Sequence, residues 1–171
     1  MTLQFLRVAL GEQMVAVRLN AVREILELPH LTPLPLTPEF VRGVMNLRGA
    51  VVPVIDLGER VGLPPTVMGR RTCVVIVDLS AEVQAKGVDD EAPLVSTVTQ
   101  TLGVLVDAVH EVFDAASHEL EPVPRLGTCV EPRWIRSMVR VRGEATPEID
   151  LDQALHHRAL AELISTHLSL H

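Results

Sequence analysis

The chain has 171 residues and a formal net charge of −7, and 47% of its residues are hydrophobic. Because it contains only three Phe, one Trp and no Tyr, its core must be built from Val, Leu and Ile, a composition that favours β-structure. The acidic balance and the shortage of aromatic rings argue against nucleic acid and anionic membrane surfaces as partners, since these need a basic face or stacking platforms.

Two isolated cysteines, Cys73 and Cys129, form neither a disulfide framework nor a zinc site, which favours a reducing compartment. Gln4 and Arg7 interrupt the apolar N-terminal segment, so it does not resemble a signal peptide. No apolar run approaches membrane-spanning length. The sequence therefore predicts a cytoplasmic protein with no direct membrane insertion.

Short segments of alternating or β-branched residues predict a chain made mostly of strands. These segments cover residues 3–10, 14–17, 41–45, 50–55, 72–79, 101–106, 108–115, 135–141 and 144–149. A helical turn within 19–26 is expected to lead into a further strand. Four prolines between residues 29 and 38 indicate an extended connection, and Pro53 marks its strand as an edge or bulged strand.

The segment from residue 80 to residue 98 is polar, acidic and broken by Gly87 and Pro93. This composition predicts a mobile loop.

Two helices are expected, a short one within 56–63 and a closing one over 151–168, with Asp150 as the N-cap of the latter and Gln153 three residues on. Short strands without long helices between them predict antiparallel barrels rather than a doubly wound sheet. The fold class is therefore all-β with a C-terminal helix.

No familiar catalytic, phosphate-binding or metal-binding pattern is found. His156 and His157 are adjacent, so on a helix they point about 100° apart rather than toward one metal ion. His167 and His171 have suitable spacing but lie at a terminus that is expected to fray. We therefore expect a binding module with no catalytic residues, no cofactor and no metal, rather than an enzyme.

Four stretches resemble the CheW family, the adaptor proteins of bacterial chemosensory arrays. The strongest is GVMNLRGAVVPVIDL, residues 43–57, which resembles the family hallmark around Asn-Leu-Arg-Gly. VREI at 22–25, GVLVDAVHEVFDA at 103–115 and IDLD at 149–152 resemble further family segments in the right order. Together the four stretches extend over nearly the whole chain.

This resemblance implies one CheW-like domain over residues 1–171, built from two SH3-like five-stranded β-barrels that share an interface. The implied lobes are residues 1–46 with 130–152, and residues 47–125, followed by a helix at 150–168. It also implies a scaffold that couples methyl-accepting receptors to a CheA-type histidine kinase. In that family the receptor tip helix docks in a groove between the lobes, and a related domain of the kinase packs against the adaptor.

The resemblance also implies which residues meet partners. Glu24 and Arg48 match a paired glutamate and arginine, and a guanidinium can hold a carboxylate through two parallel hydrogen bonds. A purely structural role for this pair and a direct partner contact both remain open. Gly43 is expected where a side chain would block close approach. Other matches to family positions near the kinase or receptor surfaces are Val22, Leu31, Thr32, Val74 and Val112, although for the aliphatic residues core packing is the ordinary alternative.

Three features depart from the family pattern. Ser137 stands where the family usually has glycine, and the 80–98 loop is long. Arg136, Arg140 and Arg142 are expected to form a basic cluster on one strand face. These departures leave a second possibility, a CheW-like interaction module of a specialised non-motility or surface-motility pathway. A regulatory lobe of a hybrid protein and an enzyme on a small barrel are further alternatives that the sequence favours less.

Overall fold

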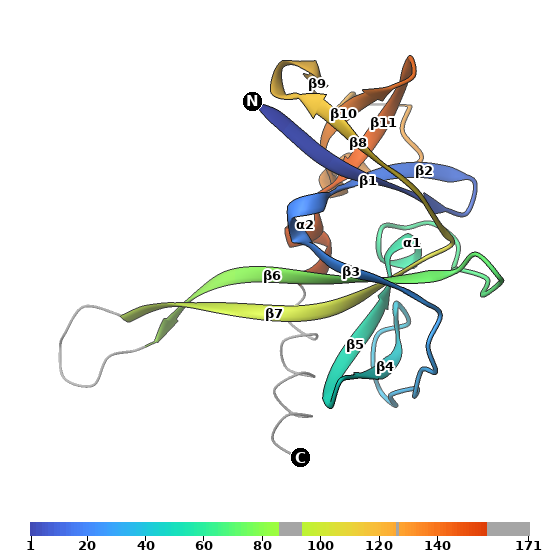
Figure 1. The fold of residues 1–171 in the computed structure, drawn as a ribbon, viewed down its shortest axis with the longest axis vertical. Helices are drawn as coiled ribbons and strands as arrows, with labels where there is room; N and C mark the ends of the chain where they lie inside the picture. The colour runs from blue at the N-terminus through green and yellow to red at the C-terminus, as the bar shows by residue number, and fades with distance from the viewer. Residues whose placement is uncertain (86–93, 126, 157–171) are drawn as a thin grey trace.

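The computed structural model describes residues 1–85, 94–125 and 127–156, and for residues 81–85 and 94–98 the backbone only. Strands dominate, and they form two sheets that lie one above the other in Figure 1. The strands are β1 (Thr2–Leu10), β2 (Gln13–Arg18), β3 (Val22–Glu27), β4 (Val41–Leu47), β5 (Ala50–Asp56), β6 (Cys73–Ala85), β7 (Leu94–Val106), β8 (Ala108–Ala116), β9 (Leu120–Glu121), β10 (Ile135–Val141) and β11 (Glu144–Ile149). The helices are η1 (Leu19–Ala21), α1 (Leu57–Arg60), η2 (Ser117–Glu119), η3 (Pro132–Trp134) and α2 (Leu151–Leu155).

The sheets define two lobes. The six-stranded lobe has the order β8-β1-β2-β11-β10-β9, and the five-stranded lobe has the order β3-β6-β7-β5-β4. The expected all-β class, the two subdomains and the helical turn before β3 are confirmed. Asp150 caps α2 by accepting a hydrogen bond from the Gln153 backbone N–H at 3.2 Å, as expected. The expected continuation of this helix to residue 168 lies outside the described residues.

Sheet membership divides the chain differently from the lobes implied by the family resemblance. Strands β3 and β4 belong to the five-stranded lobe, whereas β8 and β9 belong to the six-stranded lobe. The chain changes lobe at the short helix η1 and again at Asp107, between β7 and β8. The points where the chain passes from one lobe to the other depend on which distant strands pair, and the local pattern of residues does not predict this pairing.

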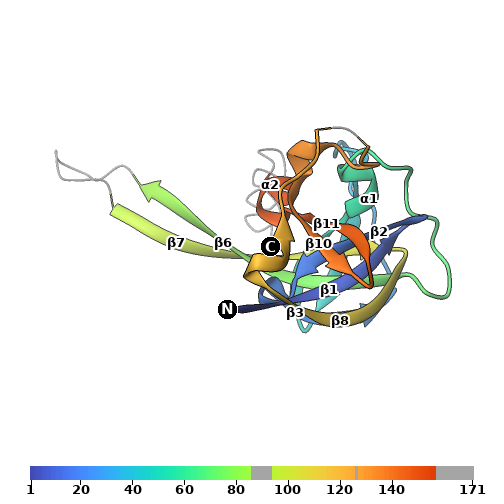
Figure 2. The same ribbon diagram turned by 90° about the horizontal axis from the view of Figure 1, so that it is seen from above.

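The prediction of a loop over 80–98 is wrong for most of its length. Strands β6 and β7 pair without interruption from Cys73↔Val106 to Ala85↔Leu94, and this hairpin projects far from the two lobes (Figures 1 and 2). The polar composition of this segment wrongly predicted a loop, because the backbone N–H and C=O groups of a two-stranded ribbon pair across the strands without needing an apolar face.

Pro53 does not mark an edge strand, because β5 lies between β4 and β7. Its parallel pairing with β7 covers only Val54 to Asp56, so the missing N–H of Pro53 falls just before that ladder begins. The β4–β5 ladder does carry an irregularity, between Val41 and Gly43.

The two lobes repeat one structural unit. Each contains a hairpin that turns at Arg-Gly and ends in Ile-Asp-Leu at the start of a short helix, β4–β5–α1 in one lobe and β10–β11–α2 in the other. Both turns place arginine and glycine at positive φ, Arg48 and Gly49 in one, Arg142 and Gly143 in the other. Both hairpins shift register near their start, between Val41 and Gly43 and between Ile135 and Ser137. Along the two units β4–β5–α1 and β10–β11–α2, each residue and its equivalent are the same number of residues apart in the chain.

Equivalent ion pairs support this repeat. Arg42 donates to Asp56 at 3.0 Å, and Arg136 donates to Asp150, also at 3.0 Å. The expected basic cluster of arginines on one strand face is therefore not formed. Each arginine is instead paired with a carboxylate, Arg136 with Asp150 and Asp152, Arg140 with Glu121, and Arg142 with Glu111. Arg142 lies in the turn after β10 rather than on the strand, which is why alternation did not place it.

The largest apolar cluster joins the two lobes. It includes Leu6, Val8 and Val17 from the six-stranded lobe, and Val75 and Val104 from the five-stranded lobe. Smaller clusters fill the inside of each lobe, around Met45, Val54 and Ile76 in one and around Phe5 and Val139 in the other. The two barrels are thus one body with a shared core. Within the residues that the structure describes, no helix has the length and apolar character needed to span a membrane.

Asp56 is the most heavily bonded carboxylate of the five-stranded lobe, and it is fully buried. It accepts hydrogen bonds from Arg42, from the backbone N–H and hydroxyl of Thr66, and from the backbone N–H of Glu59. We expect Asp56→Ala to lower the free energy of unfolding in urea by about 3 kcal/mol or more, because the Arg42 cation loses its buried partner.

The equivalent residue of the other lobe provides the control. Asp150 is partly exposed, so Asp150→Ala is expected to cost about 1 kcal/mol, the usual value of a lost helix cap. Equal losses in the two variants would contradict this difference in burial.

Candidate protein-interaction site

Strands β3 and β4 form the two edges of the five-stranded sheet, and in the described part of the chain no ladder joins them. We call the gap between them the seam. The two-residue turn between β4 and β5 lies at one end of the seam. Its residues Arg48 and Gly49 have φ values of 51° and 89°, the pattern of a type I′ hairpin turn. Asn46 stabilises the turn, because its Oδ1 accepts from the Gly49 backbone N–H at 2.9 Å.

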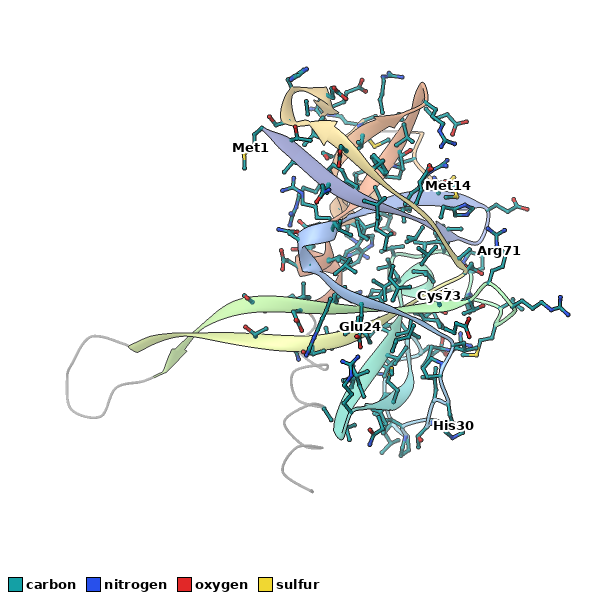
Figure 3. All side chains as sticks on the ribbon, in the orientation of Figure 1. Met1, Met14, Glu24, His30, Arg71 and Cys73 are labelled. Carbon is teal, nitrogen blue, oxygen red and sulfur yellow. The ribbon has the colours of Figure 1, made fainter. Side chains whose placement is uncertain are left out.

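This turn directs Arg48 across the seam. Arg48 Nη2 donates to Glu24 Oε2 on β3 at 2.8 Å, and Glu24 is labelled in Figure 3. The Arg48 side chain is 68% exposed and that of Glu24 is 23% exposed. The expected second, parallel hydrogen bond is not formed, and the buried Glu24 Oε1 has no hydrogen-bond partner among the described residues. With so exposed a guanidinium, the pair contributes only about 0.5 kcal/mol to stability.

Gly43 brings the proline-rich connection onto the edge of β4. Thr32 and Val44 exchange two backbone hydrogen bonds of 2.9 Å, so the connection covers the strand edge. Gly43 has a φ of 142°, and a Cβ atom there would lie 2.5 Å from the Thr32 carbonyl oxygen. Only glycine tolerates both the conformation and the contact. The expected close approach at Gly43 is therefore an approach within the chain itself.

The other sequence-expected residues are spread over the molecule. Val22 lies at the start of β3 and packs partly on the shared core, and Leu31 packs partly on the core of the five-stranded lobe. Val74 is fully buried in that same core, so it lies inside the barrel rather than on a surface. Val112 is 51% exposed on β8 of the other lobe. The structure thus gathers Val22, Glu24, Leu31, Thr32, Gly43 and Arg48 around the seam.

A seam of the same kind exists in the six-stranded lobe. Arg142, at the Arg-Gly turn, donates to Glu111 on β8 at 2.8 Å. Glu111 lies in Val109-His110-Glu111-Val112, which repeats the pattern of Val22-Arg23-Glu24-Ile25. Sequence reasoning missed this second pair. The signal was present in the two Arg-Gly turns and the two valine-x-glutamate segments.

A polar groove runs between the lobes at the base of the β6–β7 hairpin. Two adjoining cavities of about 300 Å³ and about 330 Å³ share Leu79, Ser80, Arg136 and Asp152 in their walls. Burial works against the charge of Arg136, but the neighbouring Asp150, Glu148 and Asp152 raise its pKa overall.

The buried Glu148, which lines this groove, gives a structural reason for serine at position 137. Glu148 is fully buried, and its Oε2 accepts from Arg18 Nε at 2.7 Å while its Oε1 accepts from the Ser137 hydroxyl at 2.8 Å. A glycine at position 137 would leave one buried carboxylate oxygen without its donor. Neither Arg18 nor Glu148 was singled out in the sequence, because nothing local signals that they meet.

The fold and the site define a two-lobed β-protein whose distinctive residues lie on surfaces and in an open groove. Among the residues whose side chains the structure describes, no group is suited to hold a metal ion. A family model described as CheW-like domain matches residues 4–157. The chain belongs to this family.

Named relatives agree with this assignment. The chemotaxis protein CheW of Rhizobium meliloti (strain 1021) is 28% identical over 142 residues, which is 83% of this chain and 80% of the relative. Protein FrzA of Myxococcus xanthus is 43% identical over 54 residues, 32% of this chain and 34% of FrzA. The crystal structure of the scaffolding protein TtCheW from Thermoanaerobacter tengcongensis is similar with a TM-score of 0.73 at 26% identity, covering 93% of this chain and 91% of that one.

The contact at Gly43 gives a test of the seam. Gly43→Ala should lower the free energy of unfolding by about 2 kcal/mol or more, because it adds backbone strain and a collision with Thr32. Amide hydrogen exchange at Thr32 and Val44 should rise as the connection separates from β4.

Substitutions at two other glycines separate the effect of backbone strain from that of the collision with Thr32. Gly49 has a positive φ but open space around it, so Gly49→Ala should lose about 1 kcal/mol through strain alone. Gly69 has open space and no such φ, so Gly69→Ala should change nothing measurable. A loss for Gly43→Ala no larger than that for Gly49→Ala would contradict the collision.

Proposed function

We propose that this protein is a non-catalytic scaffold adaptor of the cytoplasm that couples methyl-accepting chemotaxis-type receptors to a CheA-type histidine kinase. Membership of the CheW-like domain family supports the proposal, and so do the names of its relatives, a chemotaxis protein and a scaffolding protein. The observation that carries it is the seam, where Arg48 keeps 68% of its side chain exposed in an ion pair that contributes little to stability.

The kinase is assigned to the seam. Arg48 is held in place by Glu24 yet keeps most of its side chain exposed, and its guanidinium has further N–H groups to donate to a partner carboxylate or carbonyl. Ile25 is 42% exposed beside Glu24, and Val51 is 45% exposed on the strand that follows the turn. Arginine is among the residue types enriched in interface hot spots, so Arg48 is expected to contribute most to binding at this surface. Val22, Leu31, Thr32 and Gly43 support this surface by shaping its edge.

The receptor tip is assigned to the groove between the lobes. Val112, which is exposed on β8 and lines neither cavity, stays a separate candidate for partner contact. The groove is open, and its walls carry both signs of charge, from Arg18 and Arg136 and from Asp78, Glu148 and Asp152. Such a surface suits a partner helix with mixed charges, because opposite potentials fix its register as well as its affinity.

The alternative is a CheW-like module of a specialised non-motility or surface-motility pathway. The match to FrzA supports it, because a relative of that name shares 43% identity over 54 residues. The long β6–β7 hairpin and the Ser137–Glu148 contact are consistent with a partner set of its own.

Exchanging the charges of the seam tests the kinase surface. We expect Glu24→Arg with Arg48→Glu to keep the fold, because the ion pair is re-formed, and to weaken binding to a purified CheA-type kinase by more than tenfold in titration calorimetry. A loss of that size corresponds to about 1.4 kcal/mol.

The other lobe provides a control, Arg142→Glu, which reverses the exposed arginine of the second seam and keeps Glu111, since Glu111 also pairs with Arg7 at 3.4 Å. This variant should bind the kinase as the unchanged protein does. Kinase binding that survives the exchange at Glu24 and Arg48 would show that the pair only closes the seam.

Filling the groove tests the receptor surface. Ser80 is exposed and lines both cavities, so Ser80→Trp should weaken binding of a receptor tip fragment by at least tenfold while kinase binding stays unchanged. Val67→Trp is the control, since Val67 is highly exposed and lines neither cavity. Equal receptor binding by the two variants would place the receptor elsewhere.

A further inference from the structure

Two aromatic residues occupy equivalent places in the two lobes. Phe40 directly precedes β4, and Trp134 directly precedes β10. The backbone carbonyl of Phe40 accepts from the Asp56 N–H at 2.7 Å, and that of Trp134 accepts from the Asp150 N–H at 2.8 Å. The backbone of each aromatic residue is thus held to the start of its own short helix, and the two short helices lie between the sheets (Figure 1).

Arg60, the last residue of α1, lies between these rings. Its guanidinium carbon Cζ is 4.9 Å from the centroid of the Phe40 ring and 4.4 Å from that of the Trp134 indole. Its Nε donates to the Ala154 carbonyl oxygen of α2 at 2.6 Å. Arg60 therefore belongs to the five-stranded lobe and contacts the six-stranded lobe at two points.

The repeat explains why a single arginine fits here. Ala154 is the counterpart of Arg60 in α2, since both come three residues after the leucine of Ile-Asp-Leu. Ala154 is fully buried and has no long side chain, so it makes no counterpart of the contact that Arg60 makes. The contact is accordingly one-sided in a structure that is otherwise repeated.

The surroundings of Arg60 make the contact specific for a planar cation. Burial, and secondly the charge of Arg133, lower the pKa of Arg60, although a guanidinium stays protonated in proteins. A partly desolvated cation gains more from an aromatic face than an exposed one does. The fork of N–H groups can meet the Ala154 carbonyl while the plane of the guanidinium lies against the rings.

We propose that Arg60 is a positioning residue that fixes the angle between the two lobes. The shared apolar core holds the lobes together, but apolar attraction is non-directional, so it does not by itself fix the angle between the lobes. The hydrogen bond to Ala154 and the stacking on Trp134 both depend on direction, and both cross the lobe interface. Arg60 therefore selects one arrangement among those that the core allows.

The effect is measurable in the protein alone. Spin labels are placed at Val51→Cys on β5 and Val112→Cys on β8, one in each lobe, in the full chain with Cys73→Ala and Cys129→Ser. Electron paramagnetic resonance then gives the distribution of distances between the lobes. We expect a single narrow distribution for the parent protein, and a distribution at least twice as wide for Arg60→Met, which keeps the apolar stem and removes the charge and the donor.

Arg133→Met is the matched control. The Arg133 guanidinium also lies 4.4 Å from the Trp134 ring centroid, but Arg133 belongs to the same lobe as Trp134 and pairs with Glu131. Its removal should leave the distribution narrow. An unchanged width for Arg60→Met, or equal widening by both variants, would overturn the proposal. If Arg60→Met does not fold, Arg60→Lys replaces it, with an intermediate widening expected and an unchanged width again contradicting the proposal.

A second measurement connects Arg60 to partners and rests on the proposed adaptor function. Arg60→Met should bind the kinase alone as the parent does, yet lose severalfold in the affinity of the complex that also contains the receptor fragment. If the parent protein itself binds no kinase, the proposed function fails while the distance measurement still decides the role of Arg60. Equal affinity of both proteins for the three-component complex would show that the angle between the lobes is of no consequence for coupling.

Discussion

The apolar layer between the two sheets is the constraint on which the rest of the structure depends. Each lobe has only a small core of its own, and the largest cluster of buried side chains draws on both lobes together with α2. Neither lobe could expose its half of this cluster to water without losing much of its stability, at about 25 cal/mol per Å² of apolar surface. The surfaces on both lobes are therefore carried by one body, as a scaffold requires.

On this shared core the protein uses the same unit twice. Each lobe has an Arg-Gly turn, a glutamate across the seam and a capped Ile-Asp-Leu helix start. The same kind of ion pair spans both seams, so the ion pair does not distinguish one seam from the other. The strand edges beside the seams differ. In the five-stranded lobe the connection held by Gly43 and Thr32 covers the edge of β4, whereas in the six-stranded lobe β9 pairs with β10.

Local patterning located most strands, by alternation, and the capped helix start, by the spacing of Asp150 and Gln153, because both depend on neighbours in the sequence. It failed where distant segments decide the outcome. Val74 matches a family position near a partner surface, with core packing as the ordinary alternative, and the structure buries it in the core of the five-stranded lobe. The hairpin beyond residue 80 was missed because pairing outweighed polar composition. The meeting of Arg60 with Trp134, and of Glu148 with Arg18, could not be predicted without the arrangement of the two lobes.

The central claim is that this chain joins two other proteins without transforming either of them. Analytical ultracentrifugation of the protein mixed with a CheA-type kinase and a receptor tip fragment tests it most directly. The account predicts one sedimenting species that contains all three components in fixed proportion, and no association of kinase with receptor fragment when the chain is left out. Kinase and receptor that associate equally well without it, or a chain that sediments alone in the mixture, would contradict the account.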